Sequence, residues 1–143
     1  TPTSTIIPTR SPSVWFYQEE NLINSPEKGY TYELCAGILD KGISEEQTAI
    51  EEVLEETGYA VKDLKFITSY YSALGFAANR QILYFACIDE SMKLGAGGGV
   101  DGENIELFYL PAAKAREFMF DEKIVRAPGL ILAFQWFLSE FKA

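Results

Sequence analysis

The sequence contains no histidine and is short of basic residues, since 12 lysines and arginines stand against 21 aspartates and glutamates, for a formal net charge of −9. Proteins that bind the phosphate backbone of nucleic acids depend on Lys and Arg to neutralise it. We therefore predict that no nucleic acid polymer is a partner. A small phosphate ester is still compatible with this charge, because a divalent cation can lie between protein carboxylates and phosphates.

Cysteines and long apolar runs are also scarce. The two cysteines, Cys35 and Cys87, each lie in a short apolar stretch. A cysteine in that setting is more often a small buried residue than half of a disulfide, which favours a reducing compartment. No apolar run is long enough to cross a membrane, and the first residues do not resemble a signal peptide. We expect a cytoplasmic protein without a membrane partner.

The 143 residues, 48% of them hydrophobic, are enough for one core. Residues 1–13 are rich in Thr, Ser and Pro and are predicted to be an irregular lead-in to a single domain over residues 14–143. Apolar, β-prone stretches predict strands at 14–18, 30–35, 65–71, 81–88 and 105–110, and helices are predicted at 44–57, 112–120 and 130–141. This order predicts an α+β fold.

The helix predicted at 44–57 has a signal at each end, with Ser44 as its N-cap, Gln47 completing a capping box and Gly58 as its C-cap. Helical spacing predicts a buried face made of Ala49, Ile50, Val53, Leu54 and Thr57, and an opposite face carrying Glu52, Glu55 and Glu56. Carboxylates at this spacing repel one another unless a cation or water intervenes, and oxygen ligands suit magnesium. The alternative is an ordinary solvated acidic face.

Residues 33–37 and 52–59 together resemble the Nudix box, whose pattern is glycine, five residues, glutamate, seven residues, then Arg-Glu-apolar-x-Glu-Glu-x-Gly-apolar. The spacing from Gly37 to Gly58 matches this pattern without a gap. The resemblance to the Nudix hydrolase superfamily implies that residues 14–143 form an α/β/α sandwich with a mixed β-sheet and a loop-helix-loop. It also leads us to expect that part of the family's usual N-terminal strands is lacking.

Further segments, at residues 69–76, 79–81, 97–99 and 102–106, resemble the branch of ADP-ribose and UDP-sugar pyrophosphatases, and the UDP-glucose enzymes most of all. This resemblance implies hydrolysis of a nucleotide sugar that depends on magnesium, or alternatively manganese, and most simply converts UDP-glucose to UMP and glucose 1-phosphate. ADP-ribose is the alternative substrate, and a nucleotide-binding protein with weak or no catalysis is the alternative function. A homodimer is implied if the N-terminal strands are present.

The same resemblance assigns site residues. The predicted metal ligands are the carboxylates of Glu52, Glu55 and Glu56 and the backbone carbonyl of Ala36. A glutamate from a late, mobile loop serves as general base in related enzymes, and the glycine-rich segment 95–103 offers Glu103, which we favour, and Asp101, with Glu55 as the third acidic candidate for a catalytic role. The alternative for this loop is a flexible connection without a catalytic role.

Aromatic and basic residues near the end of the strand predicted at 65–71 are candidates for the substrate pocket. Tyr70, Tyr71 and Phe76 could stack on a uracil, although aromatic residues at strand ends are more often part of a core. Arg80 could bind a phosphate or sugar, or pair with a surface carboxylate.

Two positions depart from the box. Ile43 stands where the first glutamate is expected, and Glu51 replaces the arginine that can pair with a nearby glutamate. Glu51 lies four residues before Glu55 and adds like-charge repulsion. We therefore expect reduced activity, unless a basic residue such as Lys41 or Lys62 reaches the cluster.

Overall fold

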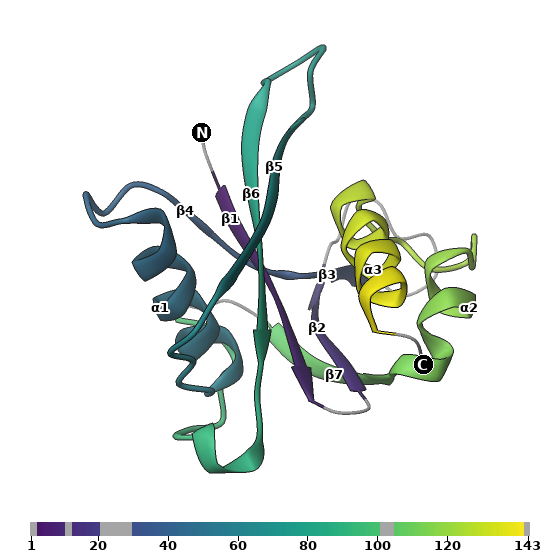
Figure 1. Ribbon diagram of the computed structural model, residues 1–143. Coiled ribbons are helices and arrows are strands. Elements are labelled where there is room, and N and C mark those ends of the chain that lie inside the picture. The colour runs from purple at the N-terminus through teal and green to yellow at the C-terminus, as the bar shows by residue number, and fades with distance from the viewer. Residues whose placement is uncertain (1–2, 11–12, 21–29, 101–104, 142–143) are drawn as a thin grey trace.

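The computed structural model describes residues 3–10, 13–20, 30–100 and 105–141. Within them seven strands form one sheet: β1 (Thr3–Arg10), β2 (Ser13–Glu20), β3 (Tyr30–Glu33), β4 (Cys35–Ile38), β5 (Lys65–Ser72), β6 (Asn79–Cys87) and β7 (Ile105–Pro111). The sheet is mixed, because β1 runs parallel to β6 while the other pairings between strands are antiparallel. Figure 1 shows β1 and β6 crossing the centre of the molecule.

The prediction of an irregular lead-in over residues 1–13 is wrong, since β1 is a central strand. It pairs with β6 from Thr3 to Thr9, with β4 from Thr3 to Ile6, and with β2 at its end. Thr and Ile are β-branched and suit extended backbone, but Ser, Thr and Pro are also typical of loops. The pairing that decides between these states comes from β6, far along the chain.

The strand predicted at 30–35 is two strands that separate at Leu34. β3 pairs with β2, whereas β4 pairs with β1. The chain therefore passes from one part of the sheet to another within a few residues. This crossing places β4 in front of the first helix, where it contributes to the site described below.

Helices cover both faces of the sheet, so the predicted α/β/α sandwich is confirmed (Figure 1). α1 (Glu45–Thr57) lies on one face, and α2 (Ala115–Met119) and α3 (Pro128–Glu140) lie on the other. Successive residues of β6 point to opposite faces. Ile82 and Tyr84 belong to the core under α1, whereas Leu83 and Phe85 belong to the core under α3.

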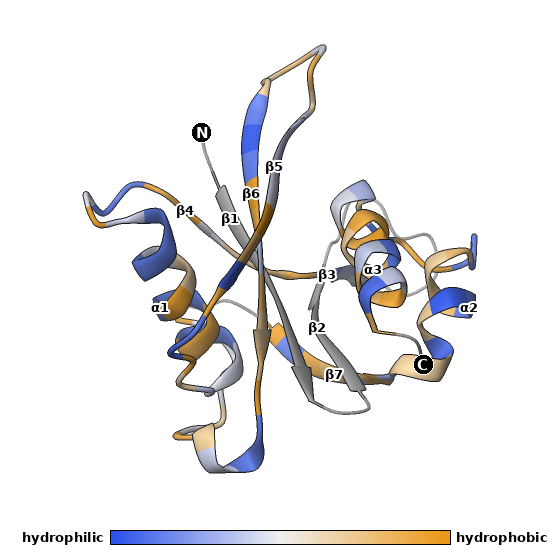
Figure 2. Cartoon of the chain, in the orientation of Figure 1, coloured by the Kyte–Doolittle hydropathy of each residue, from blue (hydrophilic) through white to orange (hydrophobic). Residues whose placement is uncertain are grey.

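The two sides differ in polarity. α3 is hydrophobic along most of its length, whereas α1 alternates between hydrophobic and hydrophilic stretches (Figure 2).

The helix predicted at 112–120 begins as a 3-10 turn, Ala112–Lys114, before α2, and a further 3-10 turn at Glu90–Met92 was not predicted. Among the residues described, the helices are all too short or too polar to cross a membrane.

The predicted ends of α1 are confirmed. The Ser44 hydroxyl oxygen accepts a hydrogen bond from the Gln47 N–H at 3.0 Å, and Gly58 adopts a left-handed φ of 78° while its N–H donates to the Leu54 carbonyl. Both caps satisfy backbone groups that the helix itself leaves unbonded. The helix that carries the box is therefore fixed at both ends by local interactions.

Replacing Ser44 with Ala is expected to lower the free energy of unfolding by about 1 kcal/mol, because the Gln47 N–H loses its acceptor. Ser44→Asp keeps an acceptor at the N-cap and should retain most of the stability. Chemical denaturation of the two variants checks this. Equal losses would show that the hydroxyl bond does not stabilise the helix.

Candidate active site

Glu52 lies against the backbone of β4 at Gly37. A β-carbon placed on Gly37 would lie 2.1 Å from Glu52 Cγ and 2.4 Å from its Oε1, far inside van der Waals contact. The Cys35 thiol, two residues earlier on β4, approaches the Glu52 backbone carbonyl at 3.5 Å. The box glycine therefore leaves a space that the Glu52 carboxylate fills, and its side chain is only 15% exposed.

Contrary to the prediction from the sequence, Glu55 and Glu56 do not both lie on the solvated face of α1. Glu56 is buried, with 4% of its surface exposed, alongside Ala49 and Val53, whereas Leu54 is 40% exposed. The predicted assignment of Leu54 to the buried face and Glu56 to the solvated face is therefore wrong. Glu56 lies three residues after Val53 and seven after Ala49, so helical geometry turns it toward the sheet.

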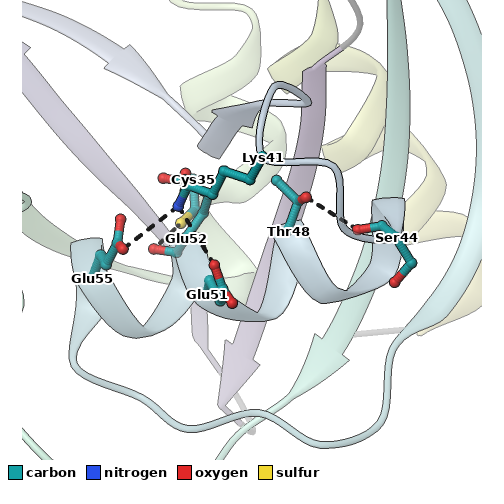
Figure 3. Close-up of polar contacts among 7 residues, drawn as sticks. All are labelled: Cys35, Lys41, Ser44, Thr48, Glu51, Glu52 and Glu55. Carbon is teal, nitrogen blue, oxygen red and sulfur yellow. Dashed lines mark hydrogen bonds and ion pairs between the residues drawn. The ribbon is translucent and has the colours of Figure 1, made fainter.

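Lys41 is the basic residue that reaches the acidic cluster. From the loop between β4 and α1, its Nζ lies 3.5 Å from Glu51 Oε2, 3.8 Å from Glu52 Oε1 and 3.7 Å from Glu55 Oε1 (Figure 3). Desolvation acts to lower the pKa of Lys41, but the three carboxylates outweigh it and raise the pKa above its usual range. Glu51 occupies the position at which the box pattern has an arginine. Lys41 therefore supplies, from the preceding loop, a positive charge beside that position.

Metal binding was predicted for Ala36, Glu52, Glu55 and Glu56, and the chemistry of these oxygen donors suits a hard divalent cation. In the part of the chain that the structure describes, however, no three carboxylates or thiols converge closely enough to hold a metal ion. Glu52 and Glu55 instead approach the Lys41 ammonium. The donor set fits magnesium by type, and two of its carboxylates, those of Glu52 and Glu55, lie beside a lysine.

The first half of the glycine-rich loop is attached to the end of α1. The N–H groups of Gly98 and Gly99 donate to the carbonyls of Glu56 and Glu55 at 2.8 and 3.1 Å. Gly97 has a φ of +73°, and a β-carbon there would lie 2.4 Å from the Glu56 carbonyl oxygen. This segment needs glycine to approach the helix, and two of its N–H groups bond to the end of α1, while the mobility of the whole loop stays a prediction.

A pocket of about 480 Å³ lies beside β4, within the usual range for small-molecule sites. It is lined by Glu33, Leu34, Ala36, Tyr70, Tyr71, Ser72, Ala73, Leu74, Gln81, Ala127, Pro128, Gly129 and Leu130. Ala36 lines the pocket, and the next residue, Gly37, backs Glu52. The pocket and the acidic cluster therefore lie on opposite sides of β4, since successive strand residues point to opposite faces, and the three box glutamates do not line the pocket.

Two of the four predicted substrate residues lie in this pocket. Tyr70 and Tyr71 line it, and burial raises the pKa of the Tyr70 hydroxyl, which lies against Gly129 at the start of α3. Phe76 is 93% exposed and is not a lining residue. Arg80 pairs with Glu45 at 3.0 Å, as the alternative reading of this residue had it.

Some pocket residues could not be predicted, and two predicted residues lie outside the part of the chain that the structure describes. Glu33 and Gln81 give the pocket polar groups, and the start of α3 closes it, but no motif or periodicity in the sequence predicts that these distant segments meet. In the sequence, Glu33 is identifiable only as part of the box-like run. The predicted general bases, Asp101 and Glu103, lie outside the described residues.

The structure combines a box helix capped at both ends, a glutamate of that helix packed against the box glycine, and an α/β/α sandwich. A comparison of the sequence with known protein families agrees with these features. The model of the NUDIX domain matches residues 2–128. The chain belongs to the Nudix family, as the resemblance of residues 33–59 predicted.

Similar curated proteins are nucleotide-sugar pyrophosphatases. The chain is 40% identical over 116 residues to the uridine diphosphate glucose pyrophosphatase of Bos taurus, which covers 78% of this chain and 52% of the relative. It is 37% identical over 110 residues to the GDP-mannose pyrophosphatase of Pectobacterium atrosepticum, covering 77% of this chain and 56% of the relative. The chain therefore spans about half the length of the curated relatives it matches.

A solved structure described as an ADP compounds hydrolase shares the fold. It superposes with a TM-score of 0.76 at 19% identity, covering 99% of this chain and 75% of that one. At this identity the likeness shows the fold alone. It confirms the predicted α+β Nudix architecture.

Proposed function

We propose that the protein hydrolyses the diphosphate of a nucleoside diphosphate sugar, with UDP-glucose as the preferred substrate and UMP and glucose 1-phosphate as products. The observation that carries this proposal is the seat of Glu52 on Gly37, one residue along β4 from a pocket of nucleotide size. The names of the curated relatives, which act on UDP-glucose and GDP-mannose, support the substrate class.

Four residues of this chain would hold the cation: Glu52, Glu55, Glu56 and, through its carbonyl, Ala36. Magnesium, or manganese in its place, would supply the positive charge that neutralises the diphosphate and favours attack by water. The general base belongs to the proposal as Glu103, with Asp101 as the alternative. Glu55 is 33% exposed, so its carboxylate can be reached from solvent.

The pocket suits the uncharged parts of the substrate. Tyr70 and Tyr71 present aromatic surface on which a base can stack, while Glu33 and Gln81 offer hydrogen-bonding groups. The described residues that line it include no lysine or arginine. The nucleoside or sugar would therefore occupy the pocket, and the diphosphate would lie at its edge near β4.

The test is to incubate the protein with UDP-glucose, GDP-mannose or ADP-ribose and magnesium, and to measure nucleotide monophosphate. We expect kcat/KM for UDP-glucose to exceed the other two by about tenfold or more, since a site that hydrogen-bonds one base leaves polar groups unpaired with another. Preference for ADP-ribose would overturn the substrate assignment. Magnesium binding without product from any substrate would favour a nucleotide-binding protein instead.

The predicted homodimer and the cytoplasmic location are part of the same proposal and stay predictions. Sedimentation of the purified protein tests the first of them.

A further inference from the structure

The diphosphate of a nucleotide sugar carries two negative charges, and the described residues that line the pocket include no lysine or arginine that could bind it beside a divalent cation. Arg80, the basic residue predicted to bind phosphate, is paired with Glu45 at 3.0 Å. Lys41 contacts both Glu52 and Glu55, the partly buried glutamates of the predicted ligand set. It therefore lies beside two of the groups that would hold the metal, next to which the diphosphate would bind.

The contacts of Lys41 are loose. Its Nζ lies 3.7 Å from Glu55 and 3.8 Å from Glu52, beyond the range of a good hydrogen bond, and only the 3.5 Å contact with Glu51 meets the limit for one. The lysine side chain is 40% exposed. It is therefore partly open to solvent and has a flexible four-carbon stem on which the ammonium can move.

A divalent cation and the Lys41 ammonium compete for the same oxygens. Magnesium binds carboxylate oxygens at about 2.0–2.1 Å, so a cation on Glu52 and Glu55 would lie within a few ångströms of the present Nζ position and repel it. Figure 3 shows the ammonium lying between these side chains. Glu52 and Glu55 would attract Lys41 less once a cation neutralises their charge, and Glu51 would remain its carboxylate neighbour.

We propose that Lys41 is a diphosphate-binding residue, which the acidic cluster holds in the metal-free protein and which transfers to the substrate diphosphate when a divalent cation takes Glu52 and Glu55. The second half of this inference, the binding of the diphosphate by Lys41, rests on the proposed function. The first half, competition between Lys41 and the cation, depends only on the observed contacts. An exposed ion pair without function is the alternative, because such pairs commonly contribute little stability.

The test is Lys41→Met, which removes the charge and keeps the length of the side chain. In calorimetry with magnesium or manganese alone, the variant should bind the cation about three- to tenfold more tightly, because a competing positive charge is gone. In turnover of UDP-glucose at saturating magnesium, its KM should rise about tenfold, because the diphosphate loses a charged partner. Lys41→Arg should stay close to the wild type in both measurements.

Lys62→Met is the matched control, since Lys62 is exposed and makes no ion pair among the described residues. It should change neither quantity. A purely structural role for Lys41 would weaken cation binding and turnover together, and an idle surface pair would leave both unchanged, so either result overturns the proposal. If the wild type hydrolyses no nucleotide sugar, the proposed function fails, and unchanged or weaker cation binding by Lys41→Met would separately overturn the competition.

Discussion

Replacing Glu52 with Gln is expected to lower kcat for UDP-glucose hydrolysis at least about a hundredfold, because changes in groups that merely orient metal ligands already cost about 10- to 100-fold. Glutamine has nearly the same shape, so it can fill the space against Gly37 that Glu52 occupies. It lacks the negative charge that would hold a divalent cation. Steady-state kinetics and calorimetric titration with magnesium measure the two consequences.

Glu46→Gln is the control for this variant. Glu46 is an exposed glutamate in the first turn of the same helix, so its replacement removes the same charge from α1 at a distance from Gly37. Its kcat and magnesium affinity should stay near those of the wild type. A Glu52→Gln protein with full activity would show that Glu52 does not hold the cation and would remove the main support for the proposed chemistry.

Local signals made α1 predictable. Its caps are formed by residues within a few positions of each end, so the sequence predicts them, and Ser44 and Gly58 form the N-terminal and C-terminal cap bonds. The box spacing then places Glu52 opposite Gly37. The contact of Lys41 with the acidic cluster was also predictable, as one of two candidate lysines, because Glu51 adds a negative charge that a nearby cation would balance.

Interactions between distant segments were not predictable in the same way. β1 is a strand because β6 and β4 pair with it, and nothing within Thr3–Arg10 distinguishes this state from a loop. The burial of Glu56 depends on how α1 is rotated against the sheet, and the observed buried side, which includes Ala49, Val53 and Glu56, faces away from Leu54. The apolar pattern favours burial of Leu54 over Glu56, so the sequence alone predicts the wrong rotation.

The shape of the pocket also depends on contacts between distant segments, which the sequence does not predict. Tyr70 and Tyr71 were predicted as substrate residues, but their position depends on the start of α3, where the Tyr70 hydroxyl approaches Gly129. No periodicity or motif links these two segments. The chemistry of the box could therefore be predicted from the sequence, whereas the shape of the adjoining pocket required the fold.

Replacing Gly37 with Ala is expected to separate cation binding from stability. The new β-carbon would lie 2.1–2.4 Å from atoms of the Glu52 side chain, so that side chain must rotate away from β4. Gly37 does not have a positive φ, so alanine can adopt its backbone conformation, and a compatible Gly→Ala change can even stabilise a fold by about 0.4–1 kcal/mol. Magnesium affinity should therefore fall about tenfold or more while thermal stability is retained.

Gly95→Ala is the matched control, since a β-carbon there would meet no atom within 4 Å and Gly95 also lacks a positive φ. Calorimetry with magnesium and thermal unfolding of both variants would be compared with the wild type. If Gly37→Ala unfolds more easily and binds magnesium normally, the glycine serves the packing of β4 alone. If it stays folded and loses the cation, the absent side chain at Gly37 is what lets Glu52 act, since the substitution changes no charge.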